Sequence, residues 1–339
     1  TLTNAVLINA ELTDVSMLDA DLTNTDFTGV TLSGDVYFTN TQLSGVSSGG
    51  MTGTPSMLPA DWKFTNGYLV GPHANLMGAN LAGADLAGAD LTAVNLAEVQ
   101  SGGITGTPHA LPQDWQLIDG FLFGPGADLT DANLTGKDLS SVNLFTATLT
   151  NATLTNTNLG SGLTGAELSM VKSGGIQGTP QSMPIGWQLI NGYLISGDAD
   201  LTDAVLTNVD LSDVNLSYAV LVDAHLDHAN LKNADLSNAT LGGVKSGGIR
   251  GTPNALPTDW QLIDGYLVGP DANLADAVLS NLDLSGKNLS NVDLSDAYLN
   301  GANLNNADLS NATLGGVKSG GITGTPHALP QDWQLIDGY

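Results

Sequence analysis

Apolar side chains recur at every fifth position along most of this chain. Through the first stretch the centres of this five-residue beat are Leu7, Leu12, Met17, Leu22, Phe27, Leu32 and Tyr37. The residue two positions before each centre is small or β-branched, as at Ala5 and Val15. A period of five fits neither the 3.6 residues of an α-helix nor the 2 of a flat strand. The pattern therefore predicts a coil that turns every five residues and points each apolar residue inward.

The same beat continues in four later stretches, and Leu is its usual centre. These stretches run from Leu76 to Leu96, Leu129 to Leu159, Leu201 to Leu241 and Leu274 to Leu314. After Leu159 the centres slip to Leu163 and Leu168, so one residue is lost near Gly160 to Gly162. We expect a local kink or bulge there.

Five tryptophan-containing interruptions separate these stretches. Ser101 to Gly120, SGGITGTPHALPQDWQLIDG, recurs unchanged as Ser319 to Gly338. The interruptions lie near 46–73, 99–126, 171–198, 244–271 and 317–339, and their tryptophans are Trp62, Trp115, Trp187, Trp260 and Trp333.

The tryptophan spacing gives an independent measure of the coil. From each tryptophan to the next, the position number rises by 53, 72, 73 and 73. The short and long spacings differ by twenty, which predicts a coil of twenty residues and loops that all emerge from one face. We expect an excursion of thirteen residues per interruption, around GTPNALPTD before Trp260, because proline lacks the donor that a ladder needs. An excursion of eight residues would instead rotate successive loops by one face.

Blocks such as Ala74 to Gly78 (ANLMG) and Ala297 to Leu299 (AYL) carry a family resemblance. They resemble the A-[DN]-L-x-x signature of pentapeptide-repeat proteins, in register over the whole chain except the tryptophan stretches. The resemblance implies an all-β fold, a right-handed quadrilateral parallel β-helix with four five-residue faces per coil. We expect residues 1–339 to form one continuous β-helix, cut from a longer array.

The composition narrows the possible partners. Eight Lys and Arg against 34 Asp and Glu give a net charge of −26, which argues against direct binding of nucleic acid and fits a basic protein partner. There are no cysteines, so no disulfide framework is possible. No apolar run reaches the eighteen residues of a membrane helix, and we expect no membrane insertion.

The outward position before each central Leu is rich in Asp and Asn. At a twenty-residue spacing, Asp and Asn stand opposite each other at Asp138 and Asn158, Asp210 and Asn230, Asn215 and Asp235, Asp283 and Asn303, and Asn288 and Asp308. Like charges on neighbouring strands repel, whereas Asp beside Asn shares hydrogen bonds. We interpret these positions as a side-chain ladder, because a calcium site needs several converging acids.

Little in the sequence predicts catalysis or a metal site. His225 and His228 lie near Asp223 and Asp227, but the expected register completes no ligand shell around them, so we expect a solvated pair and no bound metal. No nucleophile and base recur together, and the Gly-rich segments lack the order of a phosphate loop. The sequence predicts no enzyme and no cofactor.

Two lysines depart from the repeat pattern. Lys137 and Lys287 occupy the small inward position. A buried unpaired ammonium is costly, so we expect each stem to bend outward or the coil to widen.

Each tryptophan has two possible roles. The ring can clasp its loop to the coil by burying apolar area. The loops can also form a repeated contact surface, with Trp62, Trp115, Trp187, Trp260 and Trp333 as candidate binding residues.

We favour the clasp for the rings and a contact role for the outer loop surface. The leading hypothesis is a non-enzymatic structural or scaffold protein, a segment of an extracellular or cell-surface fibre that associates end to end or through its loops. The alternative is an acidic binding module that imitates DNA toward a topoisomerase-like partner, and a third possibility is metal-dependent assembly.

Overall fold

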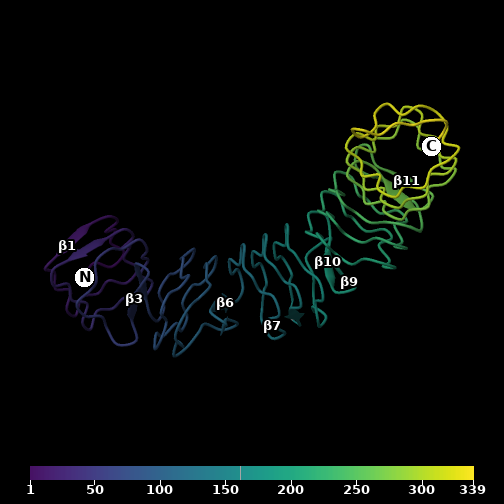
Figure 1. The fold of residues 1–339 in the computed structure, drawn as a ribbon. Coiled ribbons are helices and arrows are strands. Elements are labelled where there is room, and N and C mark those ends of the chain that lie inside the picture. Colours follow the sequence, from purple (N-terminus) through teal and green to yellow (C-terminus); the bar gives the residue numbers. More distant parts are fainter. Residues whose placement is uncertain (161) are drawn as a thin grey trace. The chain divides into compact units, whose positions relative to one another are not determined.

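The computed structural model describes residues 1–160 and 162–339. Within these ranges the chain is all-strand and contains no helix, as expected of a β-solenoid (Figure 1). Consequently, no described helix is long and apolar enough to cross a membrane. Contacts divide the chain into a first unit, residues 1–152, 158–168 and 178–185, and a second unit, residues 153–157, 169–177 and 186–339.

Two kinds of strand pair occur. Parallel pairs join successive coils, and antiparallel pairs form hairpins within the interruptions. The parallel pairs are β1 (Glu11–Thr13) with β2 (Thr31–Ser33) and β7 (Asp138–Leu139) with β8 (Asn158–Leu159). The hairpins are β3 (Lys63–Thr65) with β4 (Tyr68–Val70), β5 (Gln116–Ile118) with β6 (Phe121–Phe123), β9 (Gln188–Ile190) with β10 (Tyr193–Ile195), and β11 (Gln261–Ile263) with β12 (Tyr266–Val268).

Most coils are joined by single parallel bridges. In the uninterrupted stretches these bridges connect residues twenty positions apart, as in Val205 with His225 and His225 with Lys245. We call such a series of bridged residues a column. Neighbouring columns are offset by five residues along the chain. The bridge between Val220 and Thr240 belongs to one column, and the bridge between His225 and Lys245 belongs to the next.

The five-residue beat follows from the turn that closes each repeat. The N–H of Ala229 donates to the carbonyl of Leu226 at 3.0 Å, and His228 between them has φ 58°. Positive φ at the third residue of a turn favours Asn, Asp or Gly, which explains their frequency two positions after each centre. The central Leu and the small residue before the next centre therefore both point into the core.

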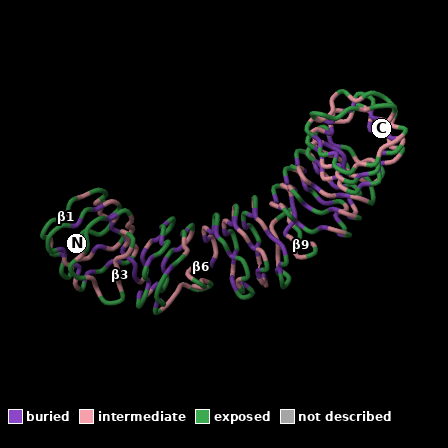
Figure 2. The backbone as a smooth tube through the Cα atoms, viewed as in Figure 1, coloured by how far each residue is buried: buried purple, intermediate pink, exposed green. Residues whose placement is uncertain are grey.

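The core of each unit is a stack of these inward side chains. Figure 2 shows buried positions recurring between exposed ones along the backbone. In the second unit Leu206, Leu226 and Leu231 are fully buried, and Ala224 and Ala229 lie between them. Since leucine supplies the centres, a core forms with few aromatic residues.

One predicted centre in the first unit is wrong. Tyr37 is only half-buried, whereas Val36 and Phe38 are fully buried. The bridge between Ser16 and Tyr37 spans twenty-one positions, so one residue has been inserted near Gly34, where φ is 62°. This insertion shifts the inward register by one position.

The predicted slip near Gly160 to Gly162 includes Ser161, which lies outside the described residues. Around it, the bridge between Thr148 and Glu167 spans nineteen positions instead of twenty. The ladder therefore absorbs the missing residue within this coil.

The expected thirteen-residue excursion is wrong. Lys245 is bridged to Asn273, twenty-eight positions on, which exceeds the usual twenty by eight. The expected excursion segment stays in the ladder, because Ala255 is bridged to Asp235 and the N–H of Asn254 donates to the carbonyl of Ala234. The additional residues lie after Ala255, in the hairpin.

The expectation that the loops leave one face is also wrong within each unit. In the second unit, Lys172 precedes one loop and shares a column with Asp200 and Val220. Lys245 precedes the next loop and lies one column further on. The tryptophans of successive loops here are seventy-three residues apart, and eight of these residues are the additional ones of the loop. The remaining sixty-five residues make three coils of twenty plus one repeat of five. Each loop is therefore displaced by one column from the loop before it.

Candidate interaction surface at the tryptophan hairpins

Each of the four hairpins is built on an Asn-Gly or Asp-Gly turn. In β11–β12, Asp264 has φ 47° and Gly265 has φ 83°. Two positive φ values define the type I′ turn that joins two-residue hairpins, and these dipeptides favour it. The sequence analysis missed this element, although QLI-DG-YLV carries its signal. The other turns are Asn66–Gly67, Asp119–Gly120 and Asn191–Gly192.

The tryptophan ring closes over the base of its hairpin. Trp260 is only 8% exposed, and a Cβ added at Gly269 would overlap its ring. Trp62 over Gly71 and Trp115 over Gly124 repeat this contact. These rings therefore act as the clasp expected of them.

The other two tryptophans differ from this pattern. In the third hairpin Ser196 occupies the glycine position, while Trp187 is half-buried like Trp62 and Trp115. Trp333 is 45% exposed.

The SGG segment is the socket in which the hairpin docks. The N–H of Leu267 donates to Ser246 Oγ at 2.9 Å, and the N–H of Ile249 donates to the carbonyl of Gly265 at 3.0 Å. Gly247 faces the ring of Tyr266, where a Cβ would lie 3.3 Å from the ring. The same serine bond occurs at Ser48, Ser101 and Ser173. The recurring Ser and Gly therefore position the hairpin.

The tyrosine hydroxyl extends this docking to the following coil. Tyr266 Oη accepts a hydrogen bond from the N–H of Val278 at 3.0 Å, and Tyr68 and Tyr193 make the same bond to Asn80 and Val205. Phe121 occupies this position in the second hairpin and cannot accept such a bond.

Lysine side chains tie three hairpins to coils. Lys137 Nζ lies 2.9 Å from Asp119 Oδ2, and Lys287 Nζ donates to Gln261 Oε1 at 2.7 Å. Both inward-position lysines therefore bend outward, as expected, and each reaches a hairpin. Lys63 in the first hairpin contacts Asp85 Oδ2 at 2.6 Å.

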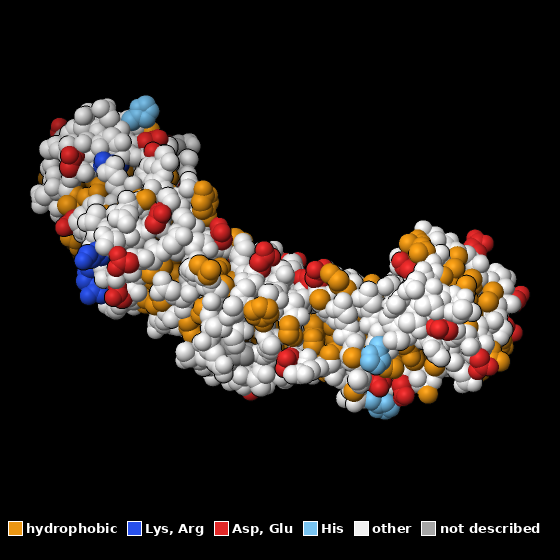
Figure 3. Space-filling model, turned by 180° about the vertical axis from the view of Figure 1, so that it is seen from behind, with side chains coloured by type: hydrophobic (Ala, Val, Ile, Leu, Met, Phe, Trp, Pro, Cys, Tyr) orange, Lys and Arg blue, Asp and Glu red, His pale blue; other side chains and the backbone are white. Residues whose placement is uncertain are grey.

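Two of the four hairpins, the second and the fourth, display acidic side chains at both ends of their first strand. Asp259 and Asp264 are exposed on either side of β11, and Asp114 and Asp119 flank β5 in the same way. Elsewhere the acids are dispersed, and on the face in Figure 3 they lie singly or in small groups. The second and fourth hairpins thus share one acidic surface, whereas the first has Asp61 and Asn66 and the third has Gly186 and Asn191 at these positions.

The Asp and Asn ladder has a direction. Asn230 Nδ2 donates to Asp210 Oδ1 at 2.8 Å, and the Asn158–Asp138 and Asn303–Asp283 pairs do the same at 3.0 and 2.9 Å. In each pair the donating amide lies on the later coil and the carboxylate on the earlier one. In the two predicted pairs with Asp on the later coil, Asn215 with Asp235 and Asn288 with Asp308, the residues are joined by a backbone bridge.

The ladder carboxylates also accept bonds within their own turn. Ser285 Oγ and N–H donate to Asp283 Oδ1 at 2.6 and 3.1 Å. The Ser285 hydroxyl, then its amide, and the amide of Asn303 lower the pKa of Asp283, while desolvation opposes them. The acid is therefore held in its ionised form.

His225 and His228 have the surroundings expected from their register. His225 is bridged to Val205 and Lys245, and a Cβ added at Gly248 would overlap the His228 ring. Over residues 1–160 and 162–339 no three His, Asp or Glu side chains converge as metal ligands. Trp62 and Trp115 belong to separate loops of the first unit, and Trp187, Trp260 and Trp333 to separate loops of the second.

Solved structures offer similar chains at low identity. HetL from the cyanobacterium Nostoc sp. strain PCC 7120, a pentapeptide-repeat protein involved in heterocyst differentiation regulation, is 24% identical, with 94% of this chain and 88% of that one covered and a TM-score of 0.13. Rfr23 from the cyanobacterium Cyanothece 51142 is 17% identical over 73% of this chain and 87% of that one, with a TM-score of 0.16. Full-length QnrB1, a plasmid-mediated fluoroquinolone resistance protein, is 12% identical over 91% of this chain and 93% of that one, with a TM-score of 0.10.

The sequence profile of one family matches the chain directly. A search of curated proteins finds no matching sequence. The profile described as pentapeptide repeats, eight copies, matches more than half of the chain, over residues 1–34, 73–100, 126–160, 210–245 and 272–317. These matches coincide with the five-residue beat and the bridged columns, and the chain belongs to the pentapeptide-repeat family.

Proposed function

We propose that this protein is a non-enzymatic structural scaffold. Residues 1–339 form one continuous right-handed quadrilateral β-helix with about twenty residues per coil, and it presents loops near 46–73, 99–126, 171–198, 244–271 and 317–339. The twenty-residue bridges, such as Asp210 with Asn230, support the coil size.

The observation that carries this proposal is the internal use of the recurring loop residues. Serine, glycine, tyrosine and tryptophan of the fourth hairpin are all engaged in docking it, through Ser246, Gly269, Tyr266 and Trp260. A loop held in this way offers a fixed outer surface instead of a catalytic group. Repetition of such a surface suits multivalent contact.

The partners we propose are further copies of the protein, end to end or through the hairpins, or a basic protein. The exposed Asp259 and Asp264, together with the net charge of −26, favour a basic partner. We propose that the chain forms part of an extracellular or cell-surface fibre, in which Trp62, Trp115, Trp187, Trp260 and Trp333 support the contact surface from below.

Light scattering across a wide concentration range tests the scaffold role. Self-association predicts that the particle mass grows with concentration. A matched variant, Asp259→Asn with Asp264→Asn, keeps the turn geometry, because Asn also tolerates positive φ. Equal growth of the variant indicates association through the ends, and reduced growth indicates the hairpins. A strict monomer that also binds no basic protein would contradict the proposal.

The net charge of −26 also favours a second candidate, an acidic module that imitates DNA toward a topoisomerase-like enzyme. The alternation of Asp with Asn in the ladder weighs against it, since it spaces the charges apart. Inhibition of gyrase-driven supercoiling at stoichiometric protein would support this candidate over the scaffold.

A further inference from the structure

The chain contains three Asn-Gly dipeptides, and all three asparagines are exposed. Asn66–Gly67 and Asn191–Gly192 form the turns of the first and third hairpins, and Asn300–Gly301 lies in an uninterrupted coil. In such a dipeptide the backbone nitrogen of the glycine can attack the side-chain carbon Cγ of the asparagine, because glycine has no Cβ that obstructs the approach. In a folded protein this reaction depends on how firmly the two groups are held.

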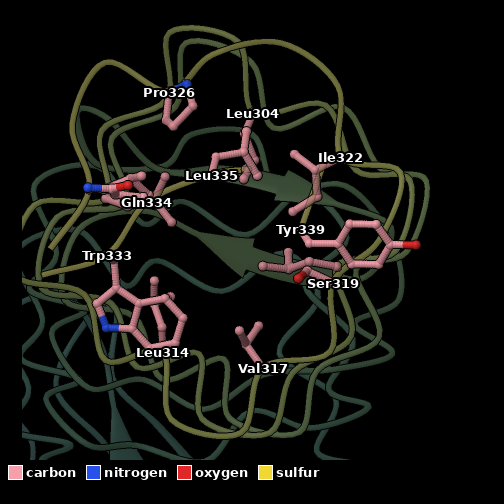
Figure 4. Close-up of a pocket in the computed structure, with 13 residues that line it drawn as sticks. Leu304, Leu314, Val317, Ser319, Ile322, Pro326, Trp333, Gln334, Leu335 and Tyr339 are labelled. Atoms are coloured by element: carbon pink, nitrogen blue, oxygen red, sulfur yellow. The ribbon is translucent and has the colours of Figure 1, made fainter. Parts of the chain in front are cut away.

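Two of the three dipeptides are held by a hydrogen bond. Asn66 Nδ2 donates to the carbonyl of Ala82 at 2.8 Å, which fixes the amide group that would have to leave. Gly301 N–H donates to the carbonyl of Gly320 at 2.8 Å, which occupies the attacking nitrogen. Gly320 directly follows Ser319, whose side chain is drawn in Figure 4. In both dipeptides a bond must break before the reaction can begin.

The dipeptide Asn191–Gly192 has neither restraint. Over residues 1–160 and 162–339, no hydrogen bond holds the Asn191 side chain or the N–H of Gly192. The carbonyl of Gly192 is anchored, because it accepts from the N–H of Ile176 at 3.0 Å. The side-chain amide and the nitrogen that must meet are therefore both free.

The third hairpin is also the least tied to its coil. The lysine contacts of the other three hairpins, made by Lys63, Lys137 and Lys287, have no counterpart in it among the described residues. Ser196 stands where the other hairpins have the glycine beneath the tryptophan. The nitrogen reaches Cγ only when the backbone of Asn191 rotates out of the turn, and a loosely tied hairpin opens more often.

We propose that Asn191 is a site of spontaneous deamidation in the folded protein. The Gly192 nitrogen loses its proton and attacks Cγ of Asn191. The new bond closes a succinimide ring, and the Cγ–Nδ2 bond breaks with loss of ammonia. Water then opens the ring at either carbonyl carbon. The product is aspartate, or isoaspartate in which the backbone passes through Cβ, and each carries a carboxylate in place of the amide.

The product resembles the turns of the second and fourth hairpins. These have Asp119 and Asp264 at the position of Asn191. The third hairpin would therefore gain with time an acidic turn residue, and the net charge would become more negative than −26. Use of this charge in partner contact rests on the proposed scaffold function, but the modification itself does not.

The test incubates the folded full chain at mildly alkaline pH in water labelled with heavy oxygen and follows the three Asn-Gly peptides by mass spectrometry. Label should enter at Asn191 first. Asn66 and Asn300 should react several-fold to about tenfold more slowly, the factor that one additional hydrogen bond provides. The same incubation in urea is the control, because without the fold all three dipeptides should react at similar rates.

Anion-exchange chromatography provides a second measurement. The incubated wild type should develop a more strongly retained species that elutes near Asn191→Asp. Asn191→Gln should develop much less of it, because the longer side chain reacts far more slowly. Labelling at Asn191 that is no faster than at Asn66 or Asn300 in the folded chain, or reaction at Asn191 in urea alone, would overturn the proposal. Neither measurement depends on self-association, so a strictly monomeric protein would leave the result unchanged.

Discussion

The hydroxyl of Tyr266 lies 3.0 Å from the backbone nitrogen of Val278 and accepts its hydrogen bond. In an uninterrupted coil this nitrogen donates to a carbonyl of the earlier coil, as His225 does to Ala204. The coil before Val278 is interrupted by the hairpin. The tyrosine thus supplies the acceptor that the interruption removes.

Adding the hydroxyl that the second hairpin lacks should stabilise the protein. Phe121 stands where the other hairpins have tyrosine, and the backbone N–H of Asn133 is the donor left without it. Phe121→Tyr should raise the free energy of unfolding by about 1 kcal/mol, the net value of one hydrogen bond. Urea unfolding measures this change.

The reverse substitution is the matched control. Tyr266→Phe should lower stability by a similar amount and speed hydrogen exchange at the amide of Val278. If both substitutions leave stability unchanged, water satisfies these amides equally well and the tyrosine has only a packing role.

Gly269→Ala should be among the more damaging single-methyl additions. The new Cβ would overlap the Trp260 ring, which is backed by the core and cannot move freely. Overpacking of this kind costs about 1–3 kcal/mol. Thermal unfolding should show a lower midpoint together with increased exposure of Trp260 to a quencher.

Gly315→Ala is the comparison for this change. No atom lies within 4 Å of a Cβ added there. Surface substitutions of this kind usually stay within about 0.5 kcal/mol. Equal loss of stability in both variants would mean that the glycine beneath the tryptophan is not required.

The direction of the ladder predicts unequal effects at two similar asparagines. Asn230 accepts from the N–H of Lys232 and donates to Asp210, whereas Asn273 accepts from the N–H of Ala275 and is bridged to Lys245. Asn230→Ala should cost about 1 kcal/mol more than Asn273→Ala, the value of the additional bond. Chemical denaturation of the two variants provides the comparison, and equal losses would remove the ladder's role in stability.

Acid should weaken the ladder. The pKa of Asp283 is lowered in the folded protein by the Ser285 hydroxyl and amide and by Asn303. Its contribution is therefore complete above the ordinary aspartate pKa of about 3.9 and is lost as pH falls through the folded value.

Asp283→Asn isolates this contribution. The variant keeps an acceptor but has no proton to bind, so its melting temperature should fall less than that of the wild type between pH 5 and pH 3, about one unit on either side of that pKa. Parallel pH profiles would show that the charge of Asp283 does not contribute.

The repeat coil could be predicted because the core leaves the sequence little choice. Leu226 and Ala224 are fully buried, so a larger side chain would overpack the core there and a smaller one would leave a cavity. The apolar residues therefore recur regularly at every fifth position. Where three apolar residues stand together, as Val36, Tyr37 and Phe38 do, periodicity does not distinguish the inward ones, and the register was missed.

The hairpins were missed for a different reason. The prolines in the segment before Trp260 suggested that this segment leaves the ladder. Backbone bridges form at only one or two residues of each repeat, however, so a proline between bridged residues is compatible with the ladder. Pro253 lies between the bridged Arg250 and Ala255, so neither bridged residue is a proline. The tryptophan spacing fits an eight-residue excursion as well as a thirteen-residue one, so sequence alone did not decide the loop direction.

Because each loop adds eight residues, the number of five-residue repeats between two loops determines two things separately. It sets the column from which the second loop leaves, and it sets how many coils separate the two loops. Within the second unit the loop that follows Lys245 lies one column beyond the loop that follows Lys172. Inserting one five-residue repeat between two loops would turn the second to the next column, whereas inserting four would leave its direction unchanged and move it along by one coil. Gain or loss of whole repeats would therefore redirect a binding loop without altering any residue within it.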